Sequence, residues 1–218
     1  MNAILPSIMQ SIKPQYCELI AAGKKTIEVR KTRPKLKPPF KVYIYCTQPK
    51  EYFSIGYHMR SAADYLYMLD NGTVKFGDGF EDYDKSKIGL NGKVIGEYVC
   101  DRITPCVPIR TRRLWDYAIS LEDEISCCLS HEQLREYGKC KTLYLWHITN
   151  LKIYDEPKEL SEFYKPCPCN NKCYECKYHF DGYFVGDTPI PDECGWFEGG
   201  DGALTRPPQS WCYVEEVS

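Results

Sequence analysis

Polar and apolar residues alternate over residues 26–30, and a period of two is typical of β-strands with one buried face. In residues 26–30, Ile27 and Val29 fall on one face and the three polar side chains fall on the other. Residues 41–47, 92–103, 143–149 and 151–154 also predict strands, the last two being separate strands or one bent strand. Residues 1–12 and 211–214 predict two further short strands.

Two other stretches carry helix signals. Pro14 fits a first helical turn, because its missing N–H costs nothing there, and a mostly apolar helix follows over residues 15–22. Gly23 is placed to end that helix. Ser130 is a good N-cap for a second helix that stops at Gly138. Several strands with two helices predict an α+β fold, a small β-barrel with capping helices.

Composition narrows the class of protein. A length of 218 residues fits one enlarged domain, or one domain with a small appendage. No apolar run approaches the roughly 20 residues that a membrane span needs. Residues 1–13 lack a basic region followed by an apolar core, so we expect a cytoplasmic protein without a membrane partner. The odd count of 13 cysteines in a chain of this length does not fit a small secreted disulfide scaffold.

Charge is distributed unevenly along the chain. Residues 1–50 carry ten Lys and Arg and only two acids, Glu18 and Glu28, which gives that segment a charge of +8. Since the whole chain carries −2, the remainder carries −10. A basic segment on an acidic body indicates a polyanion site on one face, although a solvated lysine-rich loop has the same composition.

The most informative segment joins the first helix to the following strand and reads Gly23-Lys24-Lys25-Thr26-Ile27-Glu28-Val29-Arg30. Cations at the turn and on the strand offer phosphate donors, and one carboxylate is available to hydrogen-bond a base edge. The segment resembles the G-x-K-x-x-E-x-R motif of the ASCH domain at Gly23, Lys25, Glu28 and Arg30. The later strands and the ending at residues 206–215 are also similar to ASCH proteins of bacteria and their phages.

The resemblance implies a PUA-like barrel with a cleft beside the first helix that takes RNA or a nucleotide. Lys25 and Arg30 would then contact a phosphate or a base oxygen, with Lys24 as an auxiliary contact. Glu28 would accept a hydrogen bond from a base amino group, as carboxylates do from cytosine. A purely structural alternative is that Glu28 and Arg30 pair with each other or with neighbouring residues.

An enzymatic alternative follows from the same resemblance. Some small ASCH proteins are amidohydrolases that remove the acetyl group from N4-acetylcytidine, using a Lys, a Thr three positions later and a distant Glu. Lys25 matches that Lys, but Glu28 occupies the Thr position and Thr26 lies two residues earlier. Lys25 and Glu28 would be the catalytic residues, with Glu124 or Glu132 as the third acid.

A cysteine cluster near the C-terminus has a spacing that suggests a metal site. Its pattern is C-x-C-x3-C-x2-C, and its closing C-x2-C pair is typical of a zinc knuckle. The predicted thiolate ligands of a structural Zn are Cys167, Cys169, Cys173 and Cys176, with Cys194 as a substitute for one of them and His179 as a spare ligand. Free cysteines or a disulfide are the alternative.

Aromatic and histidine residues add weaker candidates. Trp211 and Trp146 would stack on a base if they lined a basic cleft, although core packing is the commoner position of a strand Trp. His147, on an apolar strand, is predicted to be a structural histidine rather than a catalyst.

Two regions are predicted around this core. Residues 1–160 form the ASCH/PUA-like barrel domain with an inserted loop or helix region near 52–90, including a helix at 59–70. Residues 161–218 form an irregular extension, pinned by zinc, that ends in a strand returning to the barrel. A third hypothesis is a phage or host regulatory protein whose acidic, Tyr-rich segment 52–90 binds a protein partner.

Overall fold

A computed structural model describes residues 7–48, 66–68, 74–76, 90–110, 115–166, 184–185, 188–189 and 202–216. Its helices are α1 (Pro14–Ala21), α2 (Leu121–Cys127), α3 (His131–Gly138) and the 3-10 turn η3 (Leu160–Glu162). Its strands are β1 (Ser7–Ile12), β2 (Ile27–Arg30), β3 (Phe40–Cys46), β4 (Leu66–Met68), β5 (Val74–Phe76), β6 (Val94–Cys106), β7 (Pro108–Arg110), β8 (Trp115–Tyr117), β9 (Leu143–Lys158), β10 (Phe163–Tyr164), β11 (Phe184–Val185), β12 (Thr188–Pro189) and β13 (Trp211–Glu216). No described helix has the length and apolar character that crossing a membrane requires.

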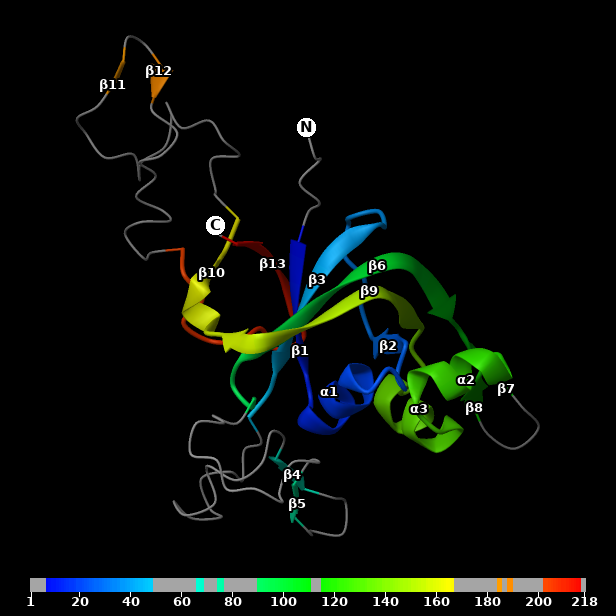
Figure 1. Ribbon diagram of the computed structural model, residues 1–218. Helices are drawn as coiled ribbons and strands as arrows, with labels where there is room; N and C mark the ends of the chain where they lie inside the picture. The colour runs from blue at the N-terminus through cyan, green and yellow to red at the C-terminus, as the bar shows by residue number, and fades with distance from the viewer. Residues whose placement is uncertain are drawn as a thin grey trace.

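The main sheet has seven strands in the order β10-β13-β1-β3-β6-β9-β2. Strands β1 and β3 run parallel, and the other neighbouring pairs run antiparallel. Among the described residues the two outer strands, β2 and β10, do not pair with each other, so the expected closed barrel is wrong: the sheet is curved but open. The short β2 bonds only to β9, and Figure 1 shows α1, α2 and α3 grouped beside it.

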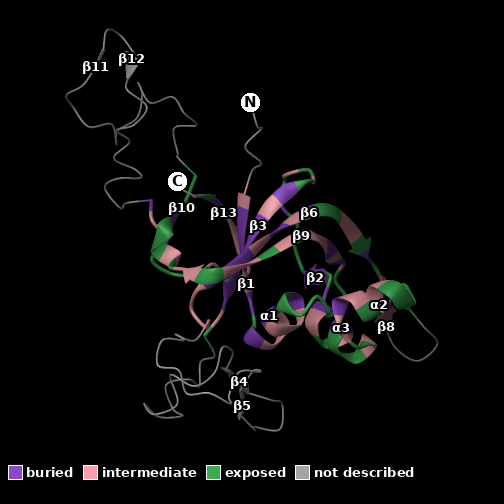
Figure 2. Cartoon of the chain, in the orientation of Figure 1, coloured by how far each residue is buried: buried purple, intermediate pink, exposed green. Residues whose placement is uncertain are grey.

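Successive side chains along a strand point to opposite faces of this sheet, so the sheet separates two hydrophobic clusters. Val42 and Ile44 of β3 belong to an inner cluster that α1 covers with Cys17 and Ile20. Tyr43 belongs to an outer cluster that the C-terminal segment covers. Purple colouring along β1 and β3 in Figure 2 marks the strands that are buried on both faces.

A third cluster lies between β2, α2 and α3. Ile27 and Val29 of β2 pack there with Leu134 of α3. The predicted N-cap of α3 is confirmed: the Ser130 hydroxyl accepts a hydrogen bond from the Gln133 backbone N–H, and the Ser130 backbone N–H donates to Gln133 Oε1.

Several boundaries differ from the sequence-based expectation. Gly138 was predicted to follow the end of the second helix. In the structure it is the last residue of α3, and the C-cap is Lys139, which takes the left-handed conformation with φ 48°. Strand β9 is one continuous element, bent by register shifts against β6. Helix α2 was not expected. Residues 66–68 form a strand within the predicted helix at 59–70, whose other residues lie outside the described part, as does most of segment 52–90.

Candidate functional site

The motif lies where the chain leaves α1 and enters β2. Gly23 follows the C-cap of α1 with φ +69°, a left-handed conformation that glycine adopts without strain, as the sequence predicted. Lys24 and Thr26 are exposed, and Thr26 donates its backbone N–H to the Ser126 carbonyl at the end of α2. Lys25 alone in this turn points inward.

Lys25, Glu28 and Arg30 form a buried network, called here the charged triad. Their exposed fractions are 1%, 6% and 6%, and with Gln10 they are the buried polar or charged side chains among the described residues. Glu28 lies between the two cations: its Oε2 is 3.3 Å from Lys25 Nζ and its Oε1 is 3.1 Å from Arg30 Nε. The triad therefore carries a net charge of +1.

Helix α2 and α1 supply the remaining contacts of Lys25. Its ammonium group donates to the carbonyl of Cys127, the last residue of α2, at 2.6 Å. The C-terminal end of a helix carries partial negative charge, so it suits a buried cation. The ring of Tyr16 on α1 lies 5.1 Å from the same nitrogen, within the range of a cation–π contact.

Arg30 spans the open side of the sheet, between β2 and the β1–β13 pair. Its Nη2 donates to the Ser11 carbonyl at 2.7 Å, and its Nη1 donates to the Ser210 carbonyl at 3.3 Å. Trp211 adds a parallel link, because its Nε1 donates to Thr32 Oγ1 at 2.9 Å. Hydrogen bonds from the Arg30 and Trp211 side chains, rather than hydrogen bonds between strand backbones, thus connect the β2 segment to β1 and to the start of β13.

Three buried donors around this region lack a hydrogen-bond acceptor among the described residues: Gln10 Nε2, Arg30 Nε and Trp146 Nε1. Arg30 Nε is close to Glu28, but its N–H is not aligned for a hydrogen bond. Trp146 faces Glu28 directly in the β2–β9 register. A polar group with acceptor atoms would satisfy such donors, since buried N–H groups without partners are costly.

Gln10 and Tyr98 were missed by the sequence analysis. Tyr98 donates its hydroxyl to Gln10 Oε1 at 2.9 Å, and burial raises the pKa of Tyr98 well above its usual value, with Glu28 adding to the shift. A signal existed for Gln10: it lies on β1 between Ile8 and Ile12 at the same strand parity, so it points into the inner core.

Exposed cations flank the buried triad in the sequence, one just before it and four after it. They are Lys24, Lys31, Arg33, Lys35 and Lys37. Lys31 lies 4.5 Å from the ring centroid of Tyr137, and Arg33 lies 5.6 Å from that of Tyr144. These two cations are therefore held against aromatic faces at the surface beside β2.

The two candidate tryptophans occupy different environments. Trp146 is fully buried and packs edge-on against Phe40, so in this conformation it is a core residue rather than a stacking platform. Trp211 is half-buried, with its ring centroid 6.1 Å from that of Trp146 and 5.6 Å from that of Tyr213.

His147 has structural partners on both ring nitrogens. Arg102 donates to Nδ1 at 3.1 Å, so Nε2 carries the proton and donates to Thr104 Oγ1 at 3.1 Å. Burial and the Arg102 charge lower the pKa of His147, which keeps the ring neutral. The predicted structural role is consistent with this geometry.

The two acids considered for catalysis lie on the α2–α3 surface. The Glu124 carboxylate pairs with His131 Nε2 at 3.4 Å, while His131 Nδ1 lies 2.7 Å from Asp116 Oδ1. Glu132 is exposed on α3. The contacts of Lys25 are made instead with Glu28 and the Cys127 carbonyl.

The predicted zinc ligands lie outside the described residues, as do Cys194 and His179. Within the part of the chain that the structure describes, no group of three His, Cys, Asp or Glu side chains is arranged to hold a metal ion. Cys17, Cys46, Cys100 and Cys106 are buried free thiols.

Comparisons with known proteins give a result at the level of structure alone. No family model matches the chain, and no curated protein is significantly similar to it. The structure of ASCH from Zymomonas mobilis is similar to it with a TM-score of 0.46 and 14% identity, over 96% of this chain and 88% of that one. Two point mutants of that protein give TM-scores of 0.45, with 14% and 13% identity, over 96% and 97% of this chain and 91% and 90% of theirs.

Proposed function

We propose that the protein binds RNA or a modified nucleotide at the surface around the charged triad. The observation that carries this proposal is the set of exposed cations that flank the triad, two of them held over tyrosine rings. Exposed Lys and Arg side chains attract phosphates, and nearby aromatic rings stack on bases. Proteins that bind single-stranded nucleic acids combine these two contributions.

The triad supports the proposal through its charge and through the unsatisfied donors of Arg30, Gln10 and Trp146. Two cations against one carboxylate leave a net positive charge in a low-dielectric setting, where it favours an anionic or acceptor-rich group. Buried ion networks contribute little to stability. The position of this network beneath a surface rich in cations therefore favours a role in recognition. In this division of roles Lys31 and Arg33 contact phosphates and Glu28 recognises a base edge.

The test is a salt titration of single-stranded RNA binding. For the wild type, log K should fall linearly with log salt, and each lost phosphate contact should reduce the slope by about 0.7. Lys31→Gln/Arg33→Gln should therefore bind more weakly with a shallower slope, whereas Lys141→Gln, an exposed lysine at the end of α3, should behave as wild type. Identical slopes in all three proteins would contradict the proposal and favour a protein partner.

The contact between Lys25 and Glu28 favours a second candidate function, amide hydrolysis of an N-acylated cytidine-type nucleoside. Their charged groups are 3.3 Å apart, a separation that allows proton transfer between an acid and a base in one site. A mass-spectrometric assay of acylated and unmodified nucleosides tests this idea. Deacylation by the wild type and its loss in Lys25→Ala would establish the enzyme; no turnover by the folded wild type would leave the binding function.

A further inference from the structure

A hollow on the outer face of the sheet is lined mainly by charged side chains, none of which belongs to the charged triad. Its volume is about 580 Å³, and its lining comes from β3, β6 and β9. Lys41 lines it from β3, next to Val42, which faces the inner core. Because neighbouring strand residues point to opposite faces, the hollow lies on the other side of the sheet from the inner core that contains Trp146.

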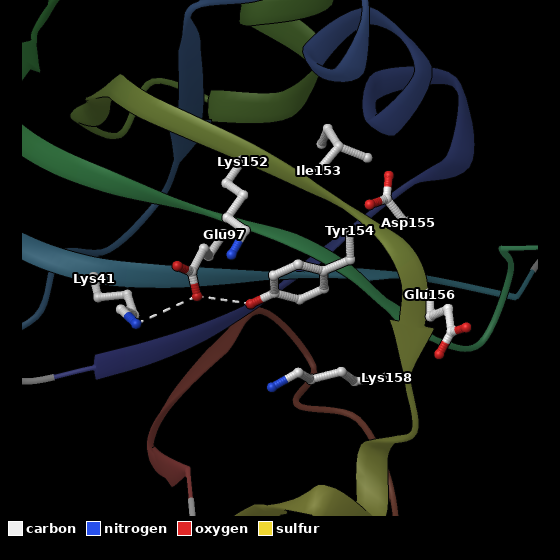
Figure 3. A pocket seen from close by; sticks show the side chains of 8 residues that line it. All are labelled: Lys41, Glu97, Lys152, Ile153, Tyr154, Asp155, Glu156 and Lys158. Carbon is white, nitrogen blue, oxygen red and sulfur yellow. Dashed lines mark hydrogen bonds and ion pairs between the residues drawn. The ribbon is translucent and has the colours of Figure 1, made fainter. Parts of the chain in front are cut away.

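A hydrogen-bonded carboxylate forms the centre of this hollow. Tyr154 donates its hydroxyl to Glu97 Oε2 at 2.7 Å, and Lys41 Nζ lies 3.3 Å from the same oxygen (Figure 3). The carboxylate is therefore compensated by a cation and a hydroxyl, and the hydrogen bond fixes the plane of the Tyr154 ring. Each side chain comes from a different strand, so the sheet itself holds the arrangement.

Two further ammonium groups lie over the Tyr154 ring. Lys152 Nζ lies 5.8 Å from the Tyr154 ring centroid and Lys158 Nζ lies 5.5 Å from it. Figure 3 shows both ammonium groups toward the hydroxyl end of the ring, while the carboxylates of Asp155 and Glu156 lie beyond its other end. Lys41 and Glu97 lie at the same end of the ring, so the three lysines that line the hollow gather there, while the lining as a whole has three lysines and three carboxylates.

We propose that this hollow binds a phosphate group through Lys152 and Lys158, with Tyr154 as the residue that positions them. Lysine ammonium groups bind phosphate as point charges with several donors each. A volume of about 580 Å³ falls in the range of small-molecule sites, so a nucleotide-sized ligand fits beyond its phosphate. The phosphate comes from a free phosphorylated molecule or from a nucleic-acid backbone. This site is independent of the triad and of the RNA surface proposed above.

The probe for this site is inorganic pyrophosphate, titrated into the full chain by calorimetry. Lys152→Gln/Lys158→Gln should weaken binding at least about tenfold, because charge-assisted hydrogen bonds are lost. The matched control is Lys13→Gln/Lys141→Gln, which removes two exposed lysines that do not line the hollow. Glu97→Gln removes the opposing charge and should tighten binding, on the order of fivefold.

Tyr154→Phe separates positioning from simple charge. It keeps every charge and the ring but removes the hydrogen bond to Glu97, so weaker pyrophosphate binding by this variant supports the positioning role. Wild-type affinity in the lysine double variant, an equal loss in the control pair, or no pyrophosphate binding by the wild type would overturn the proposal. Unfolding midpoints of all variants verify that each protein is folded.

Competition identifies the source of the phosphate. Displacement of pyrophosphate by a single-stranded RNA oligonucleotide would assign a nucleic-acid backbone, and displacement by a nucleoside diphosphate alone would assign a free ligand. Lys31→Gln/Arg33→Gln, which tests the RNA surface beside β2, should leave pyrophosphate affinity unchanged. A failure of one site is thereby distinguished from a failure of the other.

Discussion

Three ionised side chains in the triad are almost completely removed from water. Taking a carboxylate and two cations out of water costs several kcal/mol per ion, and only close pairing and hydrogen bonds to carbonyl oxygens offset that cost. The structure supplies both, since Lys25 reaches the Cys127 carbonyl and Arg30 reaches the Ser11 carbonyl. Glu28 is the only member that neutralises charge, so the network depends most on that residue.

Glu28→Gln should therefore destabilise the folded protein strongly. Removing one partner of a buried ion network leaves the other charges uncompensated, with a typical cost of about 3 to 5 kcal/mol in the free energy of unfolding. Urea unfolding followed by circular dichroism measures this change. Glu132→Gln, at an exposed position of α3, is the matched control and should have little effect.

A second substitution tests whether charge is the cause. Lys25→Met/Glu28→Gln removes one cation together with the carboxylate, so it should recover part of the stability lost in Glu28→Gln. A double variant less stable than Glu28→Gln would show that Lys25 stabilises the fold through its bond to the Cys127 carbonyl rather than through Glu28.

Burial should also control the reactivity of the thiols. Burial raises the pKa of Cys100 to about 12, and the nearby Asp101 charge adds to the shift. A raised pKa means less thiolate at a given pH, roughly one molecule in ten thousand at pH 8, and only the thiolate reacts. Iodoacetamide at pH 8 should therefore label the exposed Cys140 and spare Cys100, as peptide mass spectrometry would show. Rapid labelling of Cys100 in the folded protein would contradict this expectation.

At the scale of elements, alternation was a good guide to the strands and a poor one to the helices. Strand β3 was predicted to within one residue at each end, because its two faces enter two different clusters. Helix α2 was missed because it has no apolar stripe: Leu121 and Ile125 are exposed and only Cys127 is buried. Its hydrogen bonds to Lys25 and Thr26 use its C-terminal carbonyls, which no hydrophobic pattern encodes.

The motif was located by sequence, but its burial was not. Alternation correctly separated Ile27 and Val29 from Glu28 and Arg30. A polar face of a strand is ordinarily solvated, yet β2 is covered on both faces, by α2 and α3 on one and by the α1 side of the core on the other. That covering depends on contacts between residues more than 100 positions apart, such as Lys25 and Cys127, which no local pattern reports.

Gly138 shows how a glycine is required by packing rather than by turn geometry. A Cβ at this position would overlap the Tyr117 side chain and would lie 3.1 Å from Leu143 Cδ1. Gly138→Ala should destabilise the α3–β8 contact, because overpacking costs about 1 to 3 kcal/mol and outweighs the gain of up to about 1 kcal/mol in helix propensity. Thermal unfolding measures the net effect, with Glu136→Ala on the same helix as control. A higher melting temperature for Gly138→Ala would contradict this packing argument.

At the scale of the whole molecule, segments far apart in the sequence complete one sheet. Strand β13 lies between β1 and β10 and pairs with both of them, so residues 202–216 belong to the same sheet and core as the N-terminal strands. The intervening segment contains the cysteine cluster. A metal site there would shorten the effective loop between β10 and β13, because closing a loop before folding reduces its entropy cost.

We propose that the cluster at Cys167, Cys169, Cys173 and Cys176 binds one zinc ion per chain through its thiolates, with Cys194 as a substitute for one of them. Elemental analysis of protein purified without added metal measures the content, and Cys173→Ser/Cys176→Ser should lower it, whereas Cys140→Ser, an exposed thiol outside the cluster, should not. Chelation should release the metal and lower the unfolding temperature of the wild type, because zinc that binds only the folded chain stabilises it by mass action. Equal metal content in the cluster variant and the control would refute a zinc site at these cysteines; metal loss without any change in unfolding temperature would mean that the site does not support the β10–β13 connection.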